Sequence, residues 1–352
     1  MTMDPVTSPH GLLLLRISDV DAPLGDAFHA IKRALVLVHR LTIALSLTKS
    51  GSVSVSVSAD SNDGTITPST ITNPHSLSFH NVQRILSALY VSFTKQTVAL
   101  KRPLAELDIV FRNSCGYEIG VGSQDIIPFD VFLGMPDVTD SLEELNKRRT
   151  KHGQKSLPIF TLDLTPEVGV HTHLVEAIDS SLPHTDVQEG MYRDVVLGGT
   201  FDHLHAGHKI LLSMTAWIAS HRVVCGVTDD SMLKTKKFKE YMEPLKKRIE
   251  DVEKFLRIFK RGLVYEVVPI HDIYGPTITD DNLQTLMVSK ETLKGGDAVN
   301  EERRRRNMPP LNIEVINVIS PAETRVDEIS LKISSTYIRQ YLSEQDSPAS
   351  VN

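Results

Sequence analysis

Short apolar runs alternate with longer stretches of helical periodicity in the second half of the chain. The run DVVLGG ends in two glycines, and the next stretch, HKILLSMTAWIASH, places its apolar residues on one helical face. The runs RVVCGV, VYEVVPI, LQTLMVS and IEVINVI follow, and helices are predicted after Pro244, around Asp297 to Arg306 and from Ser334 to Leu342. Strands that alternate with helices build a parallel sheet with helices on its faces. We therefore expect a Rossmann-like α/β domain with a parallel five-stranded sheet at residues 191–346, followed by a disordered tail at 347–352.

The first half of the chain has the pattern of a smaller α/β domain, which we place at residues 1–180. Residues 27–37 and 82–93 carry helical spacing, and the run LDIVF is predicted as a short buried strand. Residues 48–76 are dominated by Ser, Thr, Val, Gly and Asn, which favours a flexible insertion over the alternative, an edge strand in SVSVSVS. The polar, Pro-containing residues 181–190 are predicted as a linker. No chemical motif marks this half, so the sequence leaves its role open.

Composition excludes several classes of protein. The 352 residues exceed one average domain, and the net charge of −6 gives no overall electrostatic reason to bind nucleic acid or an anionic membrane. The longest apolar region, residues 34–47, is too short to cross a bilayer. No secretory or mitochondrial signal is visible, and Cys115 and Cys225 lack metal-ligand spacing. We expect a cytoplasmic protein with reduced thiols and with no nucleic-acid or membrane partner.

The stretch GGTFDHLHAGH combines glycines, histidines and a predicted helix start. Gly198 and Gly199 end the first strand of the second half, where the absence of a Cβ lets the backbone approach a bulky anion. Gly207 and His208 open the next helix, whose free N–H groups and dipole favour a phosphate. His205 lies just before that helix start. We expect both imidazoles to face one pocket and to handle phosphate.

Two other interpretations of these histidines were weighed against phosphate binding. Zinc would need a third protein ligand, and apart from the nearby His203 the sequence offers no HExxH, CxxC or comparable cluster. A purely structural role would leave both rings hydrogen-bonded at a tight turn. Neither a GxGxxG fingerprint nor a GxxxxGK[ST] loop is present, so the usual dinucleotide and P-loop sites are excluded.

A second candidate site lies near the end of the chain, where Ser334, Ser335 and Thr336 precede a predicted helix. Their hydroxyls and backbone N–H groups gather at the helix N-terminus, and Arg339 adds a planar cation one turn later. We predict a site for the outer phosphates of a nucleotide. The alternative is that these residues only cap the helix, as Ser and Thr often do.

The two motifs together resemble the nucleotidyltransferase superfamily. GTFDHLHAGH resembles its HxGH signature, and ISSTYIR at 333–339 resembles its second signature, ISSTxIR. Residues 194–342 look like the eukaryotic type of phosphopantetheine adenylyltransferase, because VTDDSMLKTKK, IHDIYGPT and VSKETLKGGDAVNEER occur in that family's order. The resemblance implies that ATP and 4'-phosphopantetheine give dephospho-coenzyme A and pyrophosphate, in coenzyme A biosynthesis. It also implies direct in-line attack, with Mg2+ accompanying ATP.

The resemblance further implies roles for individual residues. It assigns ATP binding to Gly198, Gly199, Thr200, Phe201, His205, His208, Ser334, Ser335, Thr336 and Arg339. It assigns the acceptor to Thr200, Asp202, Lys234, Lys236 and Lys237, and catalysis to His205, His208, Lys236 and Lys294. Which lysine of the run KTKKFK contacts phosphate is left open, since such a run is also typical of a solvated surface. Of the run Arg303 to Arg306, we expect one or two side chains toward phosphate.

Several functions share these motifs and remain as alternatives. A cytidylyltransferase or an adenylyltransferase of the nicotinamide-mononucleotide type would carry the same two signatures. A different class of function is a scaffold, in which the first half binds other coenzyme A enzymes as partners. No feature of the sequence identifies such partners, the oligomeric state or regulation by coenzyme A.

Overall fold

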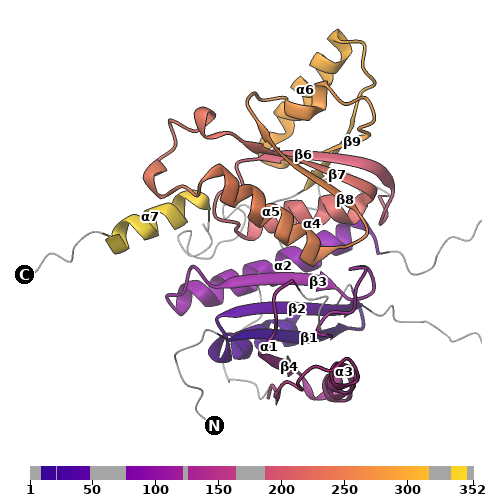
Figure 1. Ribbon diagram of the computed structural model, residues 1–352, viewed down its shortest axis with the longest axis vertical. Helices are drawn as coiled ribbons and strands as arrows, with labels where there is room; N and C mark the ends of the chain where they lie inside the picture. Colours follow the sequence, from indigo (N-terminus) through magenta and orange to yellow (C-terminus); the bar gives the residue numbers. More distant parts are fainter. Residues whose placement is uncertain are drawn as a thin grey trace, which may run out of the picture.

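The computed structural model contains two stacked α/β units (Figure 1). The structure describes residues 9–20, 22–47, 77–121, 126–163, 187–316 and 334–346. The predicted insertion at 48–76, residues 181–186 of the predicted linker and the predicted tail at 347–352 lie outside these described residues. Within them, no helix is both long and apolar enough to span a bilayer.

The first unit is a parallel sheet with the strand order β3-β2-β1-β4-β5. Its elements are β1 (His10–Ile17), α1 (Gly25–Leu37), β2 (Arg40–Leu47), α2 (Phe79–Ala99), β3 (Glu106–Phe111), β4 (Val131–Gly134), α3 (Thr139–Lys151) and β5 (Ile159–Thr161). Leu13 and Leu15 of the central strand β1 pack in the cluster that contains α1 and α2, while Leu12 and Leu14 pack with α3. Because β1 is covered on both faces, it is a continuous apolar run rather than an alternating one.

The second unit is a parallel sheet with the order β10-β9-β6-β7-β8. Its elements are β6 (Tyr192–Gly199), α4 (Ala206–Ile218), β7 (Ala219–Thr228), α5 (Leu245–Phe259), β8 (Val264–Ile270), β9 (Thr285–Ser289), α6 (Leu293–Arg305), β10 (Asn312–Ile316) and α7 (Ser335–Asp346). Val195 and Leu197 of β6 face α4 and α5, and Val196 faces the side covered by α6. The predicted Rossmann-like five-stranded parallel sheet is therefore confirmed.

The two sheets share one topology. Counted along the chain within each unit, the strand order is third, second, first, fourth, fifth in both. The order reverses next to the first strand, between β1 and β4 in one sheet and between β6 and β9 in the other. In open α/β sheets, ligands bind outside the carboxyl ends of the strands at such a reversal. The fold thus offers two comparable places for a site.

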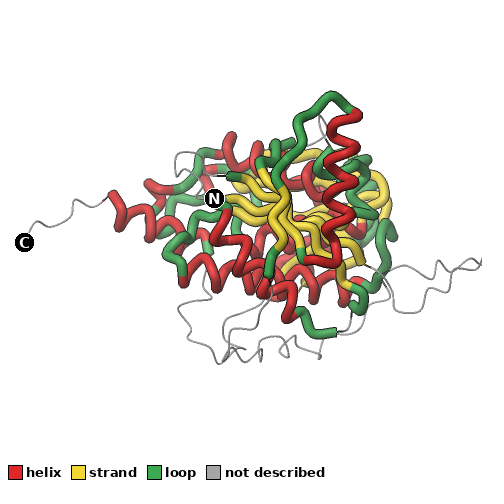
Figure 2. Tube along the Cα trace, turned by 90° about the horizontal axis from the view of Figure 1, so that it is seen from below, coloured by secondary structure: helices red, strands yellow, loops and turns green. Residues whose placement is uncertain are grey.

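The two units pack directly against each other along α2 and β3 of the first unit and α4 and α5 of the second (Figure 1). The rings of Phe79 and Trp217 lie 6.3 Å apart, and those of Phe111 and Phe259 lie 6.1 Å apart. Val187, in the segment predicted as a linker, is buried in the same apolar cluster. One continuous core therefore joins the two sheets, which are seen from below in Figure 2.

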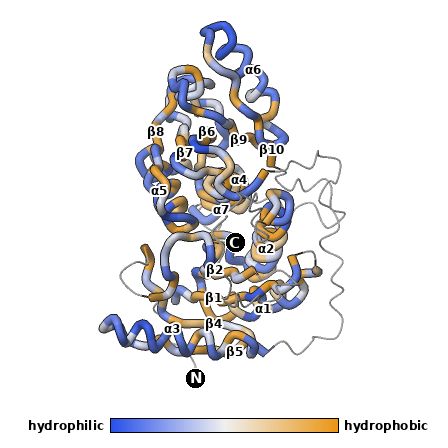
Figure 3. The backbone as a smooth tube through the Cα atoms, turned by 90° about the vertical axis from the view of Figure 1, so that its right-hand side faces the viewer, coloured by the Kyte–Doolittle hydropathy of each residue, from blue (hydrophilic) through white to orange (hydrophobic). Residues whose placement is uncertain are grey.

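Hydrophilic residues gather on the outermost helices. Figure 3 shows them along α3 at one end of the molecule and on α6 at the other. Cys115 and Cys225 are both buried and unpaired. The central strands β1 and β6 are buried between helices, whereas the edge strands β5 and β8 are only partly covered.

Some element bounds differ from those predicted. Helix α6 begins at Leu293, ahead of the predicted start at Asp297, and includes two glycines. The backbone of Gly296 packs closely on β10, since a Cβ there would lie 3.3 Å from Ile313. The helix therefore tolerates residues of poor propensity because tertiary packing compensates. Helix α7 also extends past the predicted end at Leu342.

Candidate active site

The loop between β6 and α4 has an unusual backbone. Phe201 and His203 have φ values of 51° and 46°, in the left-handed region that residues with a side chain rarely adopt. The ring of Phe201 is fully buried and lies under Gly199, where an added Cβ would meet it at 3.1 Å. Such strain persists only when surrounding contacts fix it, and it gathers at functional sites. The absence of a side chain at Gly199 therefore leaves room for the Phe201 ring and shapes the loop.

His205 and His208 form a stacked pair at the start of α4. Their ring centroids lie 3.9 Å apart with an angle of 26° between the planes, and the ring of Phe201 packs 5.3 Å from that of His208. Both Nδ1 atoms are buried without a hydrogen-bond partner among the described residues. His205 occupies the N-cap position but its side chain makes no capping hydrogen bond. The N–H groups of the first turn thus remain available, together with the dipole of α4, for an anion.

Both imidazoles are neutral at pH 7 in this environment. Burial, with a smaller effect of the nearby His203, lowers the pKa of His205 to about 4. Burial and the adjacent His205 lower the pKa of His208 well below its usual value. A neutral imidazole has one N–H donor and one acceptor nitrogen. The pair can therefore donate hydrogen bonds to phosphate oxygens without carrying a charge in the free protein.

His203 does not join this pair. Its Nε2 donates to the Tyr241 carbonyl at 2.8 Å, and its backbone N–H donates to the Glu243 carboxylate at 2.7 Å. These bonds tie the loop to the segment before α5. In the described ranges, no group of three or more His, Cys, Asp or Glu side chains is arranged to hold a metal ion.

Asp202 connects the loop to α7. Its fully buried carboxylate pairs with Arg339 through Oδ2 and accepts the Glu243 N–H through Oδ1 at 2.9 Å. The hydroxyl of Ser335 donates to the Asp202 carbonyl at 2.7 Å. The two motifs, 137 residues apart in Asp202 and Arg339, are therefore in direct contact. In the structure the guanidinium of Arg339 is occupied by protein groups, since its Nε also donates to the Lys237 carbonyl at 3.0 Å.

The hydroxyls that were predicted to bind phosphate lie at the N-terminus of α7. Ser334 and Thr336 are exposed, and Ser335 is half-buried. The Ser334 hydroxyl accepts the Tyr337 N–H at 3.3 Å, which is the capping arrangement weighed as the alternative. The Thr336 hydroxyl accepts from Arg339 at 3.2 Å. Capping does not prevent a phosphate from approaching, so the predicted role of these hydroxyls stays a prediction.

The predicted lysines lie on two neighbouring loops. Lys234, Lys236 and Lys237 are exposed in the segment after β7, and Lys294 is exposed in the first turn of α6, which follows β9. Because β7 and β9 are the two neighbours of β6, these segments begin at the same edge of the sheet as the histidine loop. They therefore add positively charged side chains to the two segments that follow the neighbours of β6.

Arg248 is a residue of this region that the sequence analysis missed. Its fully buried guanidinium donates to the carbonyls of Thr200 at 2.7 Å and Thr228 at 2.9 Å, and to Asp230 at 2.5 Å. Its Nε donates to the Glu243 carbonyl at 3.0 Å. Arg248 therefore joins the loops after β6 and β7 to the start of α5. Arg248 lies on the otherwise apolar face of the LKKRIEDV helix, and this position could have indicated that its guanidinium is buried.

Of the run Arg303 to Arg306, one or two side chains were expected toward phosphate and the rest in solvent; three of the four have protein partners in the structure. Arg303 is fully buried and donates to the carbonyls of Asp280 and Pro309. Arg305 and Arg306 pair with Glu301 and Glu302 on the same helix, α6. They lie in the last turn and at the C-cap of α6, at the opposite end of the helix from Lys294. Their partners are protein groups because this end of α6 points away from the carboxyl edge of the sheet.

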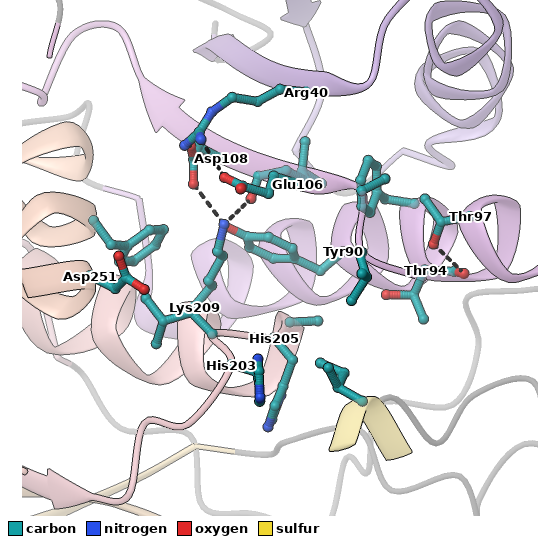
Figure 4. A pocket seen from close by; sticks show the side chains of 18 of the residues that line it. Arg40, Tyr90, Thr94, Thr97, Glu106, Asp108, His203, His205, Lys209 and Asp251 are labelled. Atoms are coloured by element: carbon teal, nitrogen blue, oxygen red, sulfur yellow. Dashed lines mark hydrogen bonds and ion pairs between the residues drawn. The ribbon is translucent and has the colours of Figure 1, made fainter. Parts of the chain in front are cut away.

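The first unit also contributes to the surroundings of the site. A cavity of about 340 Å³ lies between the two units beside the histidine loop. Figure 4 shows His203, His205 and Lys209 on one side of it and Asp108 and Tyr90 on the other. No sequence motif indicated that residues of the first half would come this close to the histidines.

Residues 196–341 match the family model described as cytidylyltransferase-like. The chain is 40% identical to phosphopantetheine adenylyltransferase of Saccharomyces cerevisiae, over 51% of this chain and 56% of that protein. It is 43% identical to an uncharacterised protein of Schizosaccharomyces pombe, over 51% of this chain and 58% of that one. It is 39% identical to phosphopantetheine adenylyltransferase of Methanopyrus kandleri, over 44% of this chain and 92% of that protein.

The match to the family model falls in the second unit, which carries the site. The alignments span little more than half the length of the two yeast relatives. Fold, motifs and family model place the protein in the cytidylyltransferase-like class. Within that class, the chain belongs to the phosphopantetheine adenylyltransferase family. The resemblance that the two motifs indicated is thereby confirmed.

Proposed function

We propose that the protein is a pantetheine-phosphate adenylyltransferase. It transfers the adenylyl group of ATP to 4'-phosphopantetheine and releases pyrophosphate, a step of coenzyme A biosynthesis. The observation that carries this proposal is the stacked, neutral pair of His205 and His208 at the N-terminus of α4, in a loop that Asp202 ties to the N-terminus of α7. The family relatives named above support the choice of substrates.

The transfer requires an oxygen of the acceptor phosphate to attack the α-phosphorus of ATP while the bond to pyrophosphate breaks. No covalent enzyme intermediate is needed, so catalysis rests on positioning and on stabilising the charge that develops on the phosphate oxygens. His205 and His208 donate N–H hydrogen bonds to these oxygens. The first-turn N–H groups and the dipole of α4 act on the same charge.

The outer phosphates require a second group of donors and cations. We propose that Ser334 and Thr336 bind the leaving pyrophosphate, and the exposure of both residues at the start of α7 supports this role. Lys236 and Lys294, on the loops flanking the end of β6, add positive charge. Mg2+ bound to ATP would neutralise part of the phosphate charge, and substrate phosphates and water would supply most of its ligands.

A substrate panel tests the proposal. Full-length protein would be supplied with ATP or CTP and with 4'-phosphopantetheine, nicotinamide mononucleotide or phosphocholine, and pyrophosphate release would be measured. We expect turnover with ATP and 4'-phosphopantetheine, and a product with the mass of dephospho-coenzyme A. Turnover with CTP or with another acceptor, and none with this pair, would replace the proposal by one of the alternative nucleotidyltransferases.

A cytoplasmic location and binding to other coenzyme A enzymes remain predictions. A pull-down with the full chain, compared with a chain that lacks residues 48–76, measures whether partners bind through that segment of the first half. Such partners would add a scaffold role to the enzyme without replacing the chemistry at α4.

A further inference from the structure

Lys209, the residue after His208, directs its side chain into the first unit. Its Nζ donates to the Leu107 carbonyl and to Asp108 Oδ1, each at 2.7 Å, although these partners lie about a hundred residues earlier in the chain. Only 9% of the Lys209 side chain and 2% of the Asp108 side chain are exposed. The ammonium also lies 5.4 Å from the centre of the Phe255 ring of α5. A lysine of the catalytic helix is thus buried between two units.

The partner of Lys209 is itself held in place. Asp108 lies on β3, the edge strand of the first sheet, and accepts a second charged hydrogen bond from Arg40 of β2 at 2.8 Å. Burial raises the pKa of Asp108, but the charges of Lys209 and Arg40 outweigh burial and hold it at about 2. Asp108 is therefore ionised at neutral pH. Arg40 pairs in addition with Glu106, whose side chain is more than half exposed.

This contact acts on the part of α4 that carries the chemistry. The Lys209 N–H donates to the His205 carbonyl at 3.0 Å, which closes the first turn of the helix. The same turn contains His208 and the free N–H groups. Figure 4 shows the Lys209 ammonium directed toward Asp108, whereas the imidazole of His205 points to the opposite side. Fixing the Lys209 ammonium against β3 therefore fixes the turn on which both imidazoles stand.

We propose that Lys209 is a positioning residue, through which Asp108 of the first unit holds His205 and His208 in the geometry needed for adenylyl transfer. The inference rests on the proposed function and gives the first half a part in it. A buried ion pair adds little net stability compared with apolar packing, but removing one partner leaves an uncompensated buried charge. Small displacements of catalytic groups have large effects on rate.

The test is a double-mutant cycle in the full-length protein with Asp108→Asn, Lys209→Met and the double variant. Each single substitution is expected to lower kcat roughly tenfold to a hundredfold, with a smaller change in the KM for ATP. The double variant is expected to be no slower than the slower single variant, because the two residues act as one unit. Lys209→Arg, which keeps the charge, restores most of the rate. Glu106→Gln, which changes an exposed carboxylate of the same strand that pairs with Arg40 and not with Lys209, is expected to leave the rate unchanged.

A direct role for Lys209 on the substrate phosphates would give a different pattern. Lys209→Met would then lose activity while Asp108→Asn, which frees the ammonium, kept it. Additive losses in the cycle, or wild-type rates in both single variants, would also overturn the proposal. Trp217, the single tryptophan of the chain, packs on Phe79 across the contact between the units, so its fluorescence reports whether a variant keeps them docked. If Asp108→Asn changes that fluorescence, the kcat of Lys209→Arg becomes the test. A fall in kcat as large as that of Lys209→Met would then contradict the proposal.

Separate measurements distinguish an error in the proposed function from an error in the role of Lys209. Turnover of the wild-type protein is measured first and bears on the function alone. The imidazole 1H–15N signals of His205 and His208 then bear on positioning without any substrate. We expect Asp108→Asn to shift these signals and Glu106→Gln to leave them in place. Unshifted signals in Asp108→Asn would contradict the positioning role whatever the reaction is.

Discussion

The two sheets have the same strand order, but the segment after their first strand differs completely. After β6, two glycines lead into a loop with left-handed residues, and Asp202 and Arg248 bind that loop to neighbouring segments. After β1, Arg16 and Ile17 occupy the positions of the glycines, and Val20 and Leu24 are buried. The first turn of α1 holds Asp26, a carboxylate.

The difference supports placing the proposed phosphate site at the second sheet and not at the corresponding edge of the first. A carboxylate in the first turn satisfies the positive end of a helix dipole and repels a phosphate. Gly199 leaves room for the Phe201 ring and so allows the loop after β6 to take its shape, whereas β1 ends in Arg16 and Ile17. The fold supplies a place for a ligand twice, but the residues of the loop decide whether the place is used. The first unit instead contributes β3 and α2 as a support for α4.

The largest expected effect is a difference in kcat between substitutions at the start of α4 and at the start of α1. His205→Ala removes one of the paired N–H donors, and we expect kcat to fall roughly a hundredfold or more, the scale for the loss of one preorganised donor. Asp26→Ala, at the corresponding helix start in the first unit, serves as the control and is expected to leave kcat unchanged. Steady-state pyrophosphate release measures both. A near-normal rate in folded His205→Ala would contradict the assignment of the site.

A smaller expected effect concerns stability: the buried histidine of the first unit, His10, should make the free energy of unfolding depend on pH. His10 of β1 binds Thr42 through Nε2 at 2.8 Å and the Pro128 carbonyl through Nδ1 at 2.9 Å, and burial lowers its pKa to about 4. As the pH falls below 6.5, the unfolded chain binds a proton at His10 that the folded chain does not bind. The free energy of unfolding should therefore fall with pH between about 6.5 and 4.

The contribution of His10 can be isolated with a variant. By linkage it amounts to about 2 to 3 kcal/mol between pH 7 and pH 4.5. Urea denaturation of the wild type and of His10→Gln across this range measures it, and the variant should show a weaker dependence on pH. Parallel curves for the two proteins would mean that His10 titrates normally in the folded state.

The sequence predicted the strands of the second unit better than those of the first. The runs at β6 to β10 were recognised because helical stretches separate them, and the alternation itself indicates a parallel sheet. In the first unit only β3 was predicted as a strand. The four leucines of β1 form a short apolar run that periodicity cannot assign to strand or helix, and β4 and β5 have only four and three residues.

The site was predictable where its residues form a local motif. His205, His208 and Ser334 stand in two recognisable motifs, and the structure brings those motifs together. Arg248 and Lys209 were missed because their partners are remote in sequence, 101 residues away for Lys209 and Asp108. For both Arg248 and Lys209, the only local indication was a charged residue on a helical face that is otherwise apolar. Such residues are worth testing for buried partners.

A crystal structure with bound ATP tests the central claim most directly. The account predicts the triphosphate at the carboxyl end of β6, with phosphate oxygens within hydrogen-bonding distance of His205 and His208 and with the outer phosphates toward Ser334. The corresponding edge of the first sheet, after β1, is expected to remain free of nucleotide. ATP bound at the edge after β1, or imidazoles that coordinate a metal and do not contact phosphate, would contradict the account.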